Sequence, residues 1–297
     1  MDRIEKALVF DGQVLVSVID IKDIVEELRK LQNLSITAAT VLGRALVIGA
    51  YMTSNLKGKG DKMSITINGG GVAGNIVVTG NAGDIIRGYI SKPQVEVPLK
   101  ENGSIDVSFA VGTEGTITVI KDLGLKEPYV GTCEIVSGRI ADDFAYYYVK
   151  SEQQPIAIAL GVKIEDNKVV SAGGVFVKPM PDCKEEILVV LEDIMTKFDN
   201  LKEQLTKESP LEIIIREFGH FEHKILEANK PKFKCICSQE RMDSIIKTLP
   251  AIECFEALKT DRKMEIVCHF CNTKYNYQAD DVIKLRNNGI IPTYEDK

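Results

Sequence analysis

Residues 232–242, KFKCICSQERM, place Cys235 and Cys237 on either side of one isoleucine. A second pair, Cys268 and Cys271, lies downstream in IVCHFCNTKY, so the full spacing is C-x-C-x30-C-x2-C. Structural zinc sites are usually closed by four protein ligands in tetrahedral geometry, and thiolate sulfur is a preferred ligand. Two sequence-close pairs that folding brings together meet this requirement. The pattern therefore predicts one Zn²⁺ per chain, held by these four cysteines.

The three histidines are weaker candidates for the same ion. His269 lies between the two cysteines of the second pair, but adjacent residues in a tight turn rarely both reach one metal. His220 and His223 lie close together on a possible helix, yet no carboxylate or third histidine accompanies them as a catalytic zinc motif requires. We expect both at the surface. Asn272 follows the second pair and tolerates the left-handed backbone of a turn.

The spacing of the cysteines also suggests redox chemistry. Four sulfur ligands leave no open coordination position, which argues against a catalytic zinc. Thiolates held on zinc are deprotonated at neutral pH, and the thiolate is the form that oxidants attack. Neighbouring cysteines are placed to form a disulfide within a pair, which would remove two of the four ligands. Structural zinc contributes about 10–16 kcal/mol to folding, more than the roughly 3–5 kcal/mol of a very small core. Oxidation is therefore expected to unfold the surrounding block.

That block, residues 231–297, holds five of the seven cysteines. Ser238 is a plausible N-cap for a helix with an apolar stripe, and Pro250 starts a second short helix. The residues around the second cysteine pair alternate like a β-hairpin, and residues 279–285, ADDVIKL, predict a closing helix. A folded unit with a core of this size is only marginally stable without a disulfide or a bound metal.

The first 180 residues favour an α+β domain, with strand runs followed by helices. Glycine turns separate short β-branched runs that read as strands. The predicted strands lie in residues 64–90, 112–124 and 167–180. The predicted helices lie in residues 21–32, 36–56 and 138–153, the last with Ile140, Phe144 and Tyr147 at helical spacing.

Residues 181–230 differ in character, because twelve acidic and seven basic residues give this segment most of the net charge of −6. Apolar residues three and four apart predict one amphipathic helix over residues 184–205. Its stripe is Leu188, Leu191, Met195, Phe198, Leu201 and Leu205. Pro210 and Gly219 bound a second helical piece. Two interpretations remain open, a solvated connector packed on the main domain or a linker that can leave its neighbour.

Composition limits the function classes. The negative net charge argues against a dominant nucleic-acid-binding role. No run of eighteen apolar residues is present, so no transmembrane helix is expected. The start, MDRIEKALVFDG, does not read as a signal peptide. We therefore expect a cytoplasmic protein, where clustered cysteines favour metal or redox chemistry over a disulfide framework.

Beyond these patterns, the chain resembles the redox-regulated 33-kilodalton heat-shock protein family, bacterial holdases also called 33 kDa chaperonins. CICSQERM with Glu253, and then CHFCNTKYNY, are similar to the zinc module of that family. DIIRGYI, VGTEGTITVIKDLGLKEPYVG, ADDFAYYYVKSEQ, LGVKI and SAGGVFV are similar to its main domain. The resemblance covers nearly the whole chain.

The resemblance implies a zinc site at the four cysteines and disulfides Cys235–Cys237 and Cys268–Cys271 on oxidation. It implies a non-enzymatic chaperone that is inactive when reduced and zinc-bound. Oxidation releases zinc, unfolds the C-terminal block and destabilises the linker, and the exposed apolar surface holds unfolding client proteins without ATP, commonly as a homodimer. The implied division is a substrate-binding core over 1–180, a linker over 181–230 and a redox switch over 231–297.

Two other functions fit parts of the sequence. One is a zinc ribbon that binds nucleic acid or the ribosome, and the other is a thiol-disulfide oxidoreductase using C-x-x-C. The remaining cysteines, Cys133, Cys183 and Cys254, are expected to be small buried hydrophobes. An intermolecular disulfide through Cys183 is an alternative for that residue.

Overall fold

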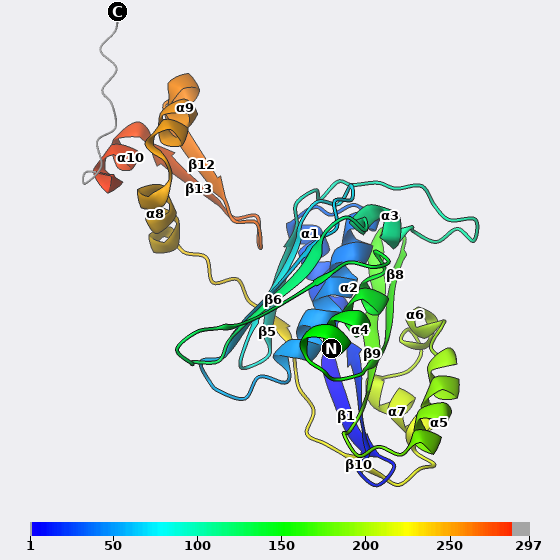
Figure 1. Ribbon diagram of the computed structural model, residues 1–297. Coiled ribbons are helices and arrows are strands. Elements are labelled where there is room, and N and C mark those ends of the chain that lie inside the picture. Colours follow the sequence, from blue (N-terminus) through cyan, green and yellow to red (C-terminus); the bar gives the residue numbers. More distant parts are fainter. Residues whose placement is uncertain (1, 287–297) are drawn as a thin grey trace, which may run out of the picture. The chain divides into compact units, whose positions relative to one another are not determined.

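The computed structural model describes residues 2–286, and contacts along the chain divide it into two compact units, Met1–Lys234 and Cys235–Lys297. The first unit holds two β-sheets with helices, and the second is a small α+β unit (Figure 1). The predicted α+β fold class is confirmed. Residues 287–297, the end of the predicted block 231–297, lie outside the described residues.

The first sheet, called sheet A, is antiparallel and buried on both faces. Its strand order is β10-β1-β2-β9-β8. The bounds are β1 Arg3–Val9, β2 Val14–Asp20, β8 Ala157–Glu165, β9 Lys168–Pro179 and β10 His223–Ile225. Alternate residues of a strand point to opposite faces. In β9, Phe176 therefore belongs to one hydrophobic cluster and Val175 and Val177 to another. Sheet A thus needs a cover on each side.

The second sheet, called sheet B, contains the glycine-separated strands that the sequence predicts. Its strand order is β11-β5-β4-β3-β6-β7. The bounds are β3 Lys62–Asn68, β4 Ile76–Asn81, β5 Ile85–Ile90, β6 Thr116–Asp122, β7 Tyr129–Glu134 and β11 Lys232–Phe233. Neighbouring strands are antiparallel except β11, which runs parallel to β5. The expected strands at residues 64–90 and 112–124 are confirmed.

Helix α2, Ile36–Thr53, packs against strands of both sheets and forms the centre of the first unit (Figure 1). It begins at Ser35, whose side chain accepts a hydrogen bond from the Ala38 N–H. By length and composition α2 could cross a membrane, and 89% of it is buried inside the protein, as in a core helix. Arg44 interrupts its apolar residues, which is why the sequence shows no unbroken run.

Three further helices complete this core. They are α1 Lys22–Leu31, α3 Val107–Val111 and α4 Ile140–Ser151. The predicted helices at residues 21–32 and 138–153 are confirmed, and Ile140, Phe144 and Tyr147 are buried as their spacing indicates. Tyr51 of α2 stacks on Phe176, with ring centroids 4.1 Å apart, and so joins α2 to sheet A.

The other face of sheet A is covered by α5 Glu185–Thr196, α6 Leu201–Gln204 and α7 Pro210–Phe218. The single helix expected over residues 184–205 is wrong, because the chain turns after Thr196. Gln204 Nε2 donates to the Lys197 carbonyl at that turn, 2.7 Å away. Phe198 and Leu201 remain buried against the sheet.

The predicted apolar stripe is also shifted by one residue at two positions of α5. Ile187 and Ile194 are buried, whereas Leu188 is 37% exposed and Met195 is only partly buried. The second helical piece is confirmed as α7, with Ser209 and Glu212 forming a reciprocal capping box and Pro210 in the first turn.

The second unit follows the sequence closely. Its elements are α8 Gln239–Thr248, α9 Ala251–Asp261, β12 Lys263–Val267, β13 Lys274–Gln278 and α10 Ala279–Leu285. Ser238 caps α8 and Pro250 precedes α9, as expected. The hydrophobic core consists of six buried residues in the described part of the chain. They are Met242, Ile246, Cys254, Met264, Tyr277 and Val282.

Gly49 of α2 allows close approach to sheet B, because a Cβ there would lie 2.4 Å from Val78 Cγ1. We expect Gly49→Ala to destabilise the first unit by about 1–3 kcal/mol through overpacking, despite the better helix propensity of alanine. Urea unfolding followed by circular dichroism measures this cost. In a Val78→Ala background the cost should shrink, since the clashing methyl group is gone. Equal costs in both backgrounds would contradict the steric explanation.

Candidate metal centre

The fold of the second unit brings the four cysteines of the two pairs together. Cys235 and Cys237 lie just before α8, and Cys268 and Cys271 lie in the connection between β12 and β13. All four Sγ atoms lie within 4.8 Å of one another. The Sγ–Sγ distance is 3.6 Å from Cys235 to Cys268 and 3.4 Å from Cys237 to Cys271.

These distances fit a tetrahedral metal site. Zinc–sulfur bonds of about 2.3 Å place the sulfurs of a tetrahedron about 3.8 Å apart. The cluster is half-buried, with Cys268 buried and the other three cysteines at intermediate exposure. The site can therefore hold one metal ion, and its all-thiolate donor set suits zinc.

The connection between β12 and β13 is a turn that directs two sulfurs to one side. The strands pair from Lys263 with Gln278 up to Val267 with Lys274. Inside the turn, the Cys268 N–H donates to the Thr273 carbonyl at 2.9 Å, and the Asn272 N–H donates to the Cys268 carbonyl at 2.7 Å. Asn272 has φ of 58°, which confirms the expected left-handed residue at this point.

Burial and hydrogen bonds to sulfur shift the pKa of three of the thiols in different directions. Burial raises the pKa of Cys235 and of Cys268. Backbone N–H groups oppose this effect at both residues, from Cys237 onto Cys235 and from Cys271 and Phe270 onto Cys268.

At Cys271 the balance is reversed. Burial again acts to raise the pKa, but hydrogen bonds from the Thr273 side chain and backbone and from the other thiols lower it to about 7. The Thr273 hydroxyl oxygen is 3.1 Å from Cys271 Sγ. Thiolate character, which metal binding and oxidation both require, is therefore favoured at this edge of the cluster.

Two polar neighbours of the sulfurs escaped the sequence analysis. Thr273 contacts Cys271, and Tyr275 is hydrogen-bonded to Cys237, which raises the pKa of the tyrosine to about 12. Both follow Cys271 at even spacing, with Thr273 directly before β13 and Tyr275 within it. The period-two alternation of a strand places them on one face, which is the signal that could have found them.

The histidines do not join the cluster. His269 is exposed, and the group of possible ligands found among residues 2–286 consists of the four cysteines alone. His220 and His223 are both exposed, as expected, but the expectation that they share a helix is wrong. His220 follows the end of α7 and His223 begins β10, with its Nδ1 2.9 Å from the Phe221 carbonyl oxygen.

The other three cysteines lie away from the cluster. Cys133 of β7 and Cys254 of α9 are buried, as expected, whereas Cys183 has intermediate exposure beside the core under α5. Burial, with nearby Glu134 and Asp143, raises the pKa of Cys133 to about 11. Cys254 Sγ lies 3.6 Å from Arg286 Nη1. Cys268 and Cys271 lie in a hairpin and not at the start of a helix, unlike the cysteines of thioredoxin-like enzymes.

Fold and site together define a class of protein, an α+β core joined to a small unit built around a four-cysteine metal site. The family model described as Hsp33 protein matches residues 2–278. The chain belongs to the Hsp33 family, and this supports a chaperone function that involves binding unfolded proteins.

Relatives and a solved structure agree with this assignment. The "33 kDa chaperonin" of Caldanaerobacter subterraneus subsp. tengcongensis is 41% identical over 276 residues, which is 92% of this chain and 94% of that protein. The protein of the same name from Bacillus subtilis is 38% identical over 97% of this chain and 99% of its own length. The crystal structure of the Thermotoga maritima 33 kDa chaperonin matches with a TM-score of 0.88 and 33% identity, covering 97% and 98% of the two chains.

The donor set can be tested by removing one sulfur. We expect Cys235→Ser to reduce bound zinc well below one ion per chain after purification under reducing conditions, because a neutral hydroxyl replaces a thiolate ligand. Zinc is measured by atomic emission on the folded protein. The matched control is Cys254→Ala, which removes a cysteine of the same unit outside the cluster and should retain one ion per chain. Full, tight zinc occupancy in Cys235→Ser would contradict the assignment.

Proposed function

We propose that this protein is a redox-regulated, ATP-independent holdase that protects unfolding and oxidatively damaged proteins from aggregation. The observation that carries the proposal is the cluster of four thiols within 4.8 Å of one another. The same four sulfurs can hold a metal or pair with each other. The metal-bound state is the inactive form of the chaperone, and the disulfide-bonded state is the active form.

In the reduced protein, Cys235, Cys237, Cys268 and Cys271 hold one Zn²⁺ per chain. Zinc would supply the link between α8 and the β12–β13 hairpin, worth about 10–16 kcal/mol in small zinc peptides. The core of the second unit has few buried residues and provides roughly 3–5 kcal/mol. The unit therefore depends on the metal for its folded state.

Oxidation removes the ligands in pairs. A thiolate attacks a peroxide, breaks its O–O bond and becomes a sulfenic acid, and the second thiolate then displaces hydroxide from that sulfur to form the S–S bond. Each pair gives two electrons to the peroxide. We propose the pairs Cys235–Cys237 and Cys268–Cys271. The Sγ–Sγ contacts at 3.6 Å and 3.4 Å each join a cysteine of one pair to a cysteine of the other, so neither of them is a contact between the proposed disulfide partners.

The segment of residues 181–230 acts as the redox-sensitive linker between a core substrate-binding domain, 1–180, and a redox-switch domain, 231–297. In the resting state α5 and α7 bury the apolar face of sheet A, including Val16, Val175 and Val177. We propose that unfolding of the switch domain, which follows this segment along the chain, destabilises the packing of the segment on sheet A. Its departure uncovers a continuous apolar surface for unfolded clients.

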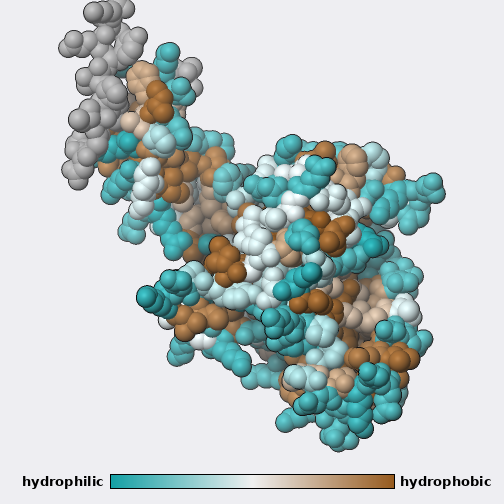
Figure 2. Space-filling view, in the orientation of Figure 1, coloured by the Kyte–Doolittle hydropathy of each residue, from teal (hydrophilic) through white to brown (hydrophobic). Residues whose placement is uncertain are grey.

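The linker is also apolar on part of its outer surface. Figure 2 shows hydrophobic residues on the surface over α5, where Leu188, Val189 and Val190 are exposed. A released α5 would therefore present apolar residues on more than one side. This favours binding to clients and homodimerisation after oxidation, since both bury apolar area.

The remaining parts of the proposal follow from charge and ligand number. A net charge of −6 disfavours nucleic acid as a partner, and a closed four-sulfur site disfavours an enzyme. We propose action in the cytoplasm without membrane association, where reduced thiols are the resting state.

The decisive experiment compares reduced and peroxide-treated protein in one preparation. Light scattering of a thermally aggregating client measures holdase activity, and a chromogenic indicator measures released zinc. We expect the oxidised protein to suppress aggregation and to have released about one zinc per chain, and the reduced protein to do neither. Equal suppression of client aggregation by the reduced and the oxidised protein would contradict the proposed redox switch. Steeply salt-dependent binding to RNA would favour the nucleic-acid alternative.

Linker docking can be weakened without touching the thiols. Phe218 of α7 is fully buried against sheet A, so Phe218→Ala should cost about 3–5 kcal/mol of packing. We expect this variant to suppress client aggregation while still reduced and zinc-bound.

Ile215 of the same helix is 45% exposed, so Ile215→Ala is the matched control and should stay inactive until oxidised. Limited proteolysis reports whether the linker has undocked. An undocked but inactive Phe218→Ala protein would show that linker release alone does not create the binding surface.

A further inference from the structure

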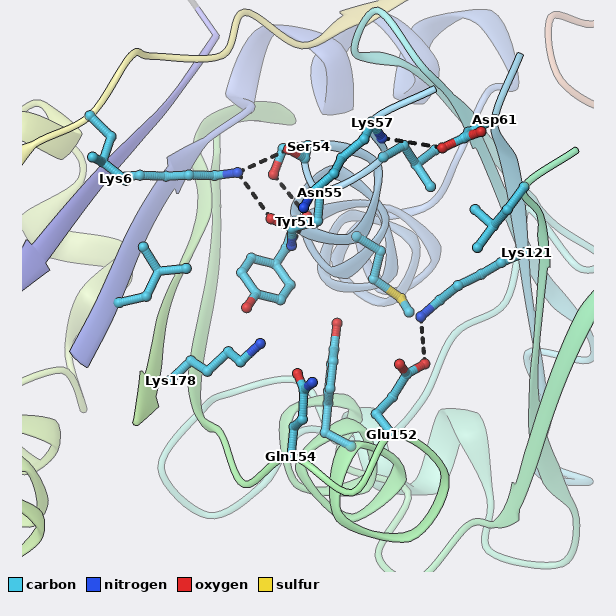
Figure 3. Close-up of a pocket in the computed structure, with 16 residues that line it drawn as sticks. Lys6, Tyr51, Ser54, Asn55, Lys57, Asp61, Lys121, Glu152, Gln154 and Lys178 are labelled. Atoms are coloured by element: carbon cyan, nitrogen blue, oxygen red, sulfur yellow. Dashed lines mark hydrogen bonds and ion pairs between the residues drawn. The ribbon is translucent and has the colours of Figure 1, made fainter. Parts of the chain in front are cut away.

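A pocket of about 690 Å³ lies within the first unit, outside the elements of the proposed switch site. The end of α2 and the turn after it form one wall, and β1, β6, β9 and the end of α4 supply side chains around the rest. Figure 3 shows lysines from separate elements directed toward this space. Its volume falls in the range of small-molecule sites, roughly 300–1,000 Å³.

The lining carries more positive than negative charge. Four lysines line the pocket, against two carboxylates. The lysines are Lys6, Lys57, Lys121 and Lys178, and the acids are Asp61 and Glu152. The lining therefore has a formal surplus of two positive charges, which a dianion would neutralise.

Both carboxylates already have partners. Glu152 Oε1 lies 2.5 Å from Lys121 Nζ and accepts a hydrogen bond from the Tyr147 hydroxyl at 2.8 Å. Asp61 Oδ2 accepts from the backbone N–H groups of Lys57 and Gly58. Neither acid is positioned by these contacts as the counter-ion of Lys6 or Lys178.

Lys6 is held in place by hydrogen bonds and forms no salt bridge with any residue that the structure describes, although the negative charge of Asp84 opposes the lowering of its pKa by burial. Its side chain extends from β1 to the end of α2, where Nζ donates to the Ser54 carbonyl at 3.0 Å and to Asn55 Oδ1 at 3.1 Å. These bonds place an ammonium at the negative end of the helix dipole. They also leave one of its three N–H donors for a ligand. The residue is only 8% exposed, so its charge is poorly solvated.

Lys178 of β9 makes no side-chain hydrogen bond or ion pair with any residue that the structure describes. Its ammonium points into the pocket (Figure 3). Burial lowers its pKa, the negative charge of Glu152 opposes this effect, and the positive charge of Lys121 adds to it. An unpaired, partly buried cation of this kind is costly unless something binds it.

Hydroxyl donors and apolar walls complete the lining. Burial raises the pKa of Tyr51 to about 12 and raises that of Tyr148, so both hydroxyls keep their protons and can donate. Leu15, Leu123 and Leu226 provide apolar surface beside the cations. Cations, hydroxyl donors and apolar walls together are typical of a site for an organic or inorganic oxyanion.

We propose that this pocket is a binding site for a small phosphate-bearing anion, with Lys178 as its principal ionic contact and Lys6 as the second. A phosphate group carries close to two negative charges at neutral pH and three acceptor oxygens, which matches the surplus of the lining. A monocarboxylate carries only one negative charge, half of what the lining would neutralise, and so matches the site less well. The site is separate from the thiol switch, and it does not depend on the proposed chaperone activity.

The test uses the reduced full-length protein, with inorganic pyrophosphate and adenosine monophosphate as probes in titration calorimetry at low ionic strength. We expect at least one probe to bind and Lys178→Met to weaken that binding about tenfold or more, as expected for loss of a charge-assisted contact. Lys168 lies on the same strand β9 but is exposed and outside the pocket. Lys168→Met is therefore the matched control and should change affinity less than about twofold.

A second measurement avoids substitution altogether. Acylation of surface amines, read by mass spectrometry, should modify Lys178 more slowly when the bound probe is present, with Lys168 unaffected. Failure of both probes to bind, equal loss of affinity in the two variants, or no protection of Lys178 would overturn the proposal.

Discussion

The arrangement of four sulfurs is the constraint on which the second unit depends. In the part of this unit that the structure describes, six buried hydrophobic residues make a core too small to hold three helices and a hairpin by burial alone. The thiols converge from two segments that are separated by about thirty residues. A metal ion at this point would join those segments directly, and its loss would remove a contribution larger than that of the core. Under the proposed function, folding of the unit would therefore be linked to the chemical state of the thiols.

The first unit has a different weakness, because sheet A is apolar on both faces. One face packs on α2, which also serves sheet B and is part of the central core. The other face is covered by three short helices that carry much of the negative charge of the chain. This valine-rich face contributes to stability while it is covered, and an exposed apolar patch of this kind would bind other apolar surfaces. Under the proposed function, these acidic residues would help to keep the helices hydrated after they leave sheet A.

Local rules predicted the second unit well. Ser238, Pro250 and Asn272 each act through their own backbone neighbourhood, so capping and turn preferences identified them directly. The prediction from helical periodicity failed in residues 184–205, because the apolar spacing of three and four residues continues through the turn after Thr196. There the burial of Phe198 and Leu201 on sheet A decides where the helix ends. Strands β1 and β2 were not anticipated, because strands buried on both faces show no simple alternation.

The sequence by itself determined the four candidate ligands, the fold class and the family resemblance, because cysteine spacing and local motifs are properties of short segments. Only the tertiary structure decided that Thr273 and Tyr275 contact the sulfurs, and that Cys235 contacts Cys268 while Cys237 contacts Cys271. It also brought Lys6 and Lys178 to one pocket from strands far apart in the chain. The grouping of the two lysines depends on strand order and helix packing, which place distant residues together without leaving a local pattern in the sequence.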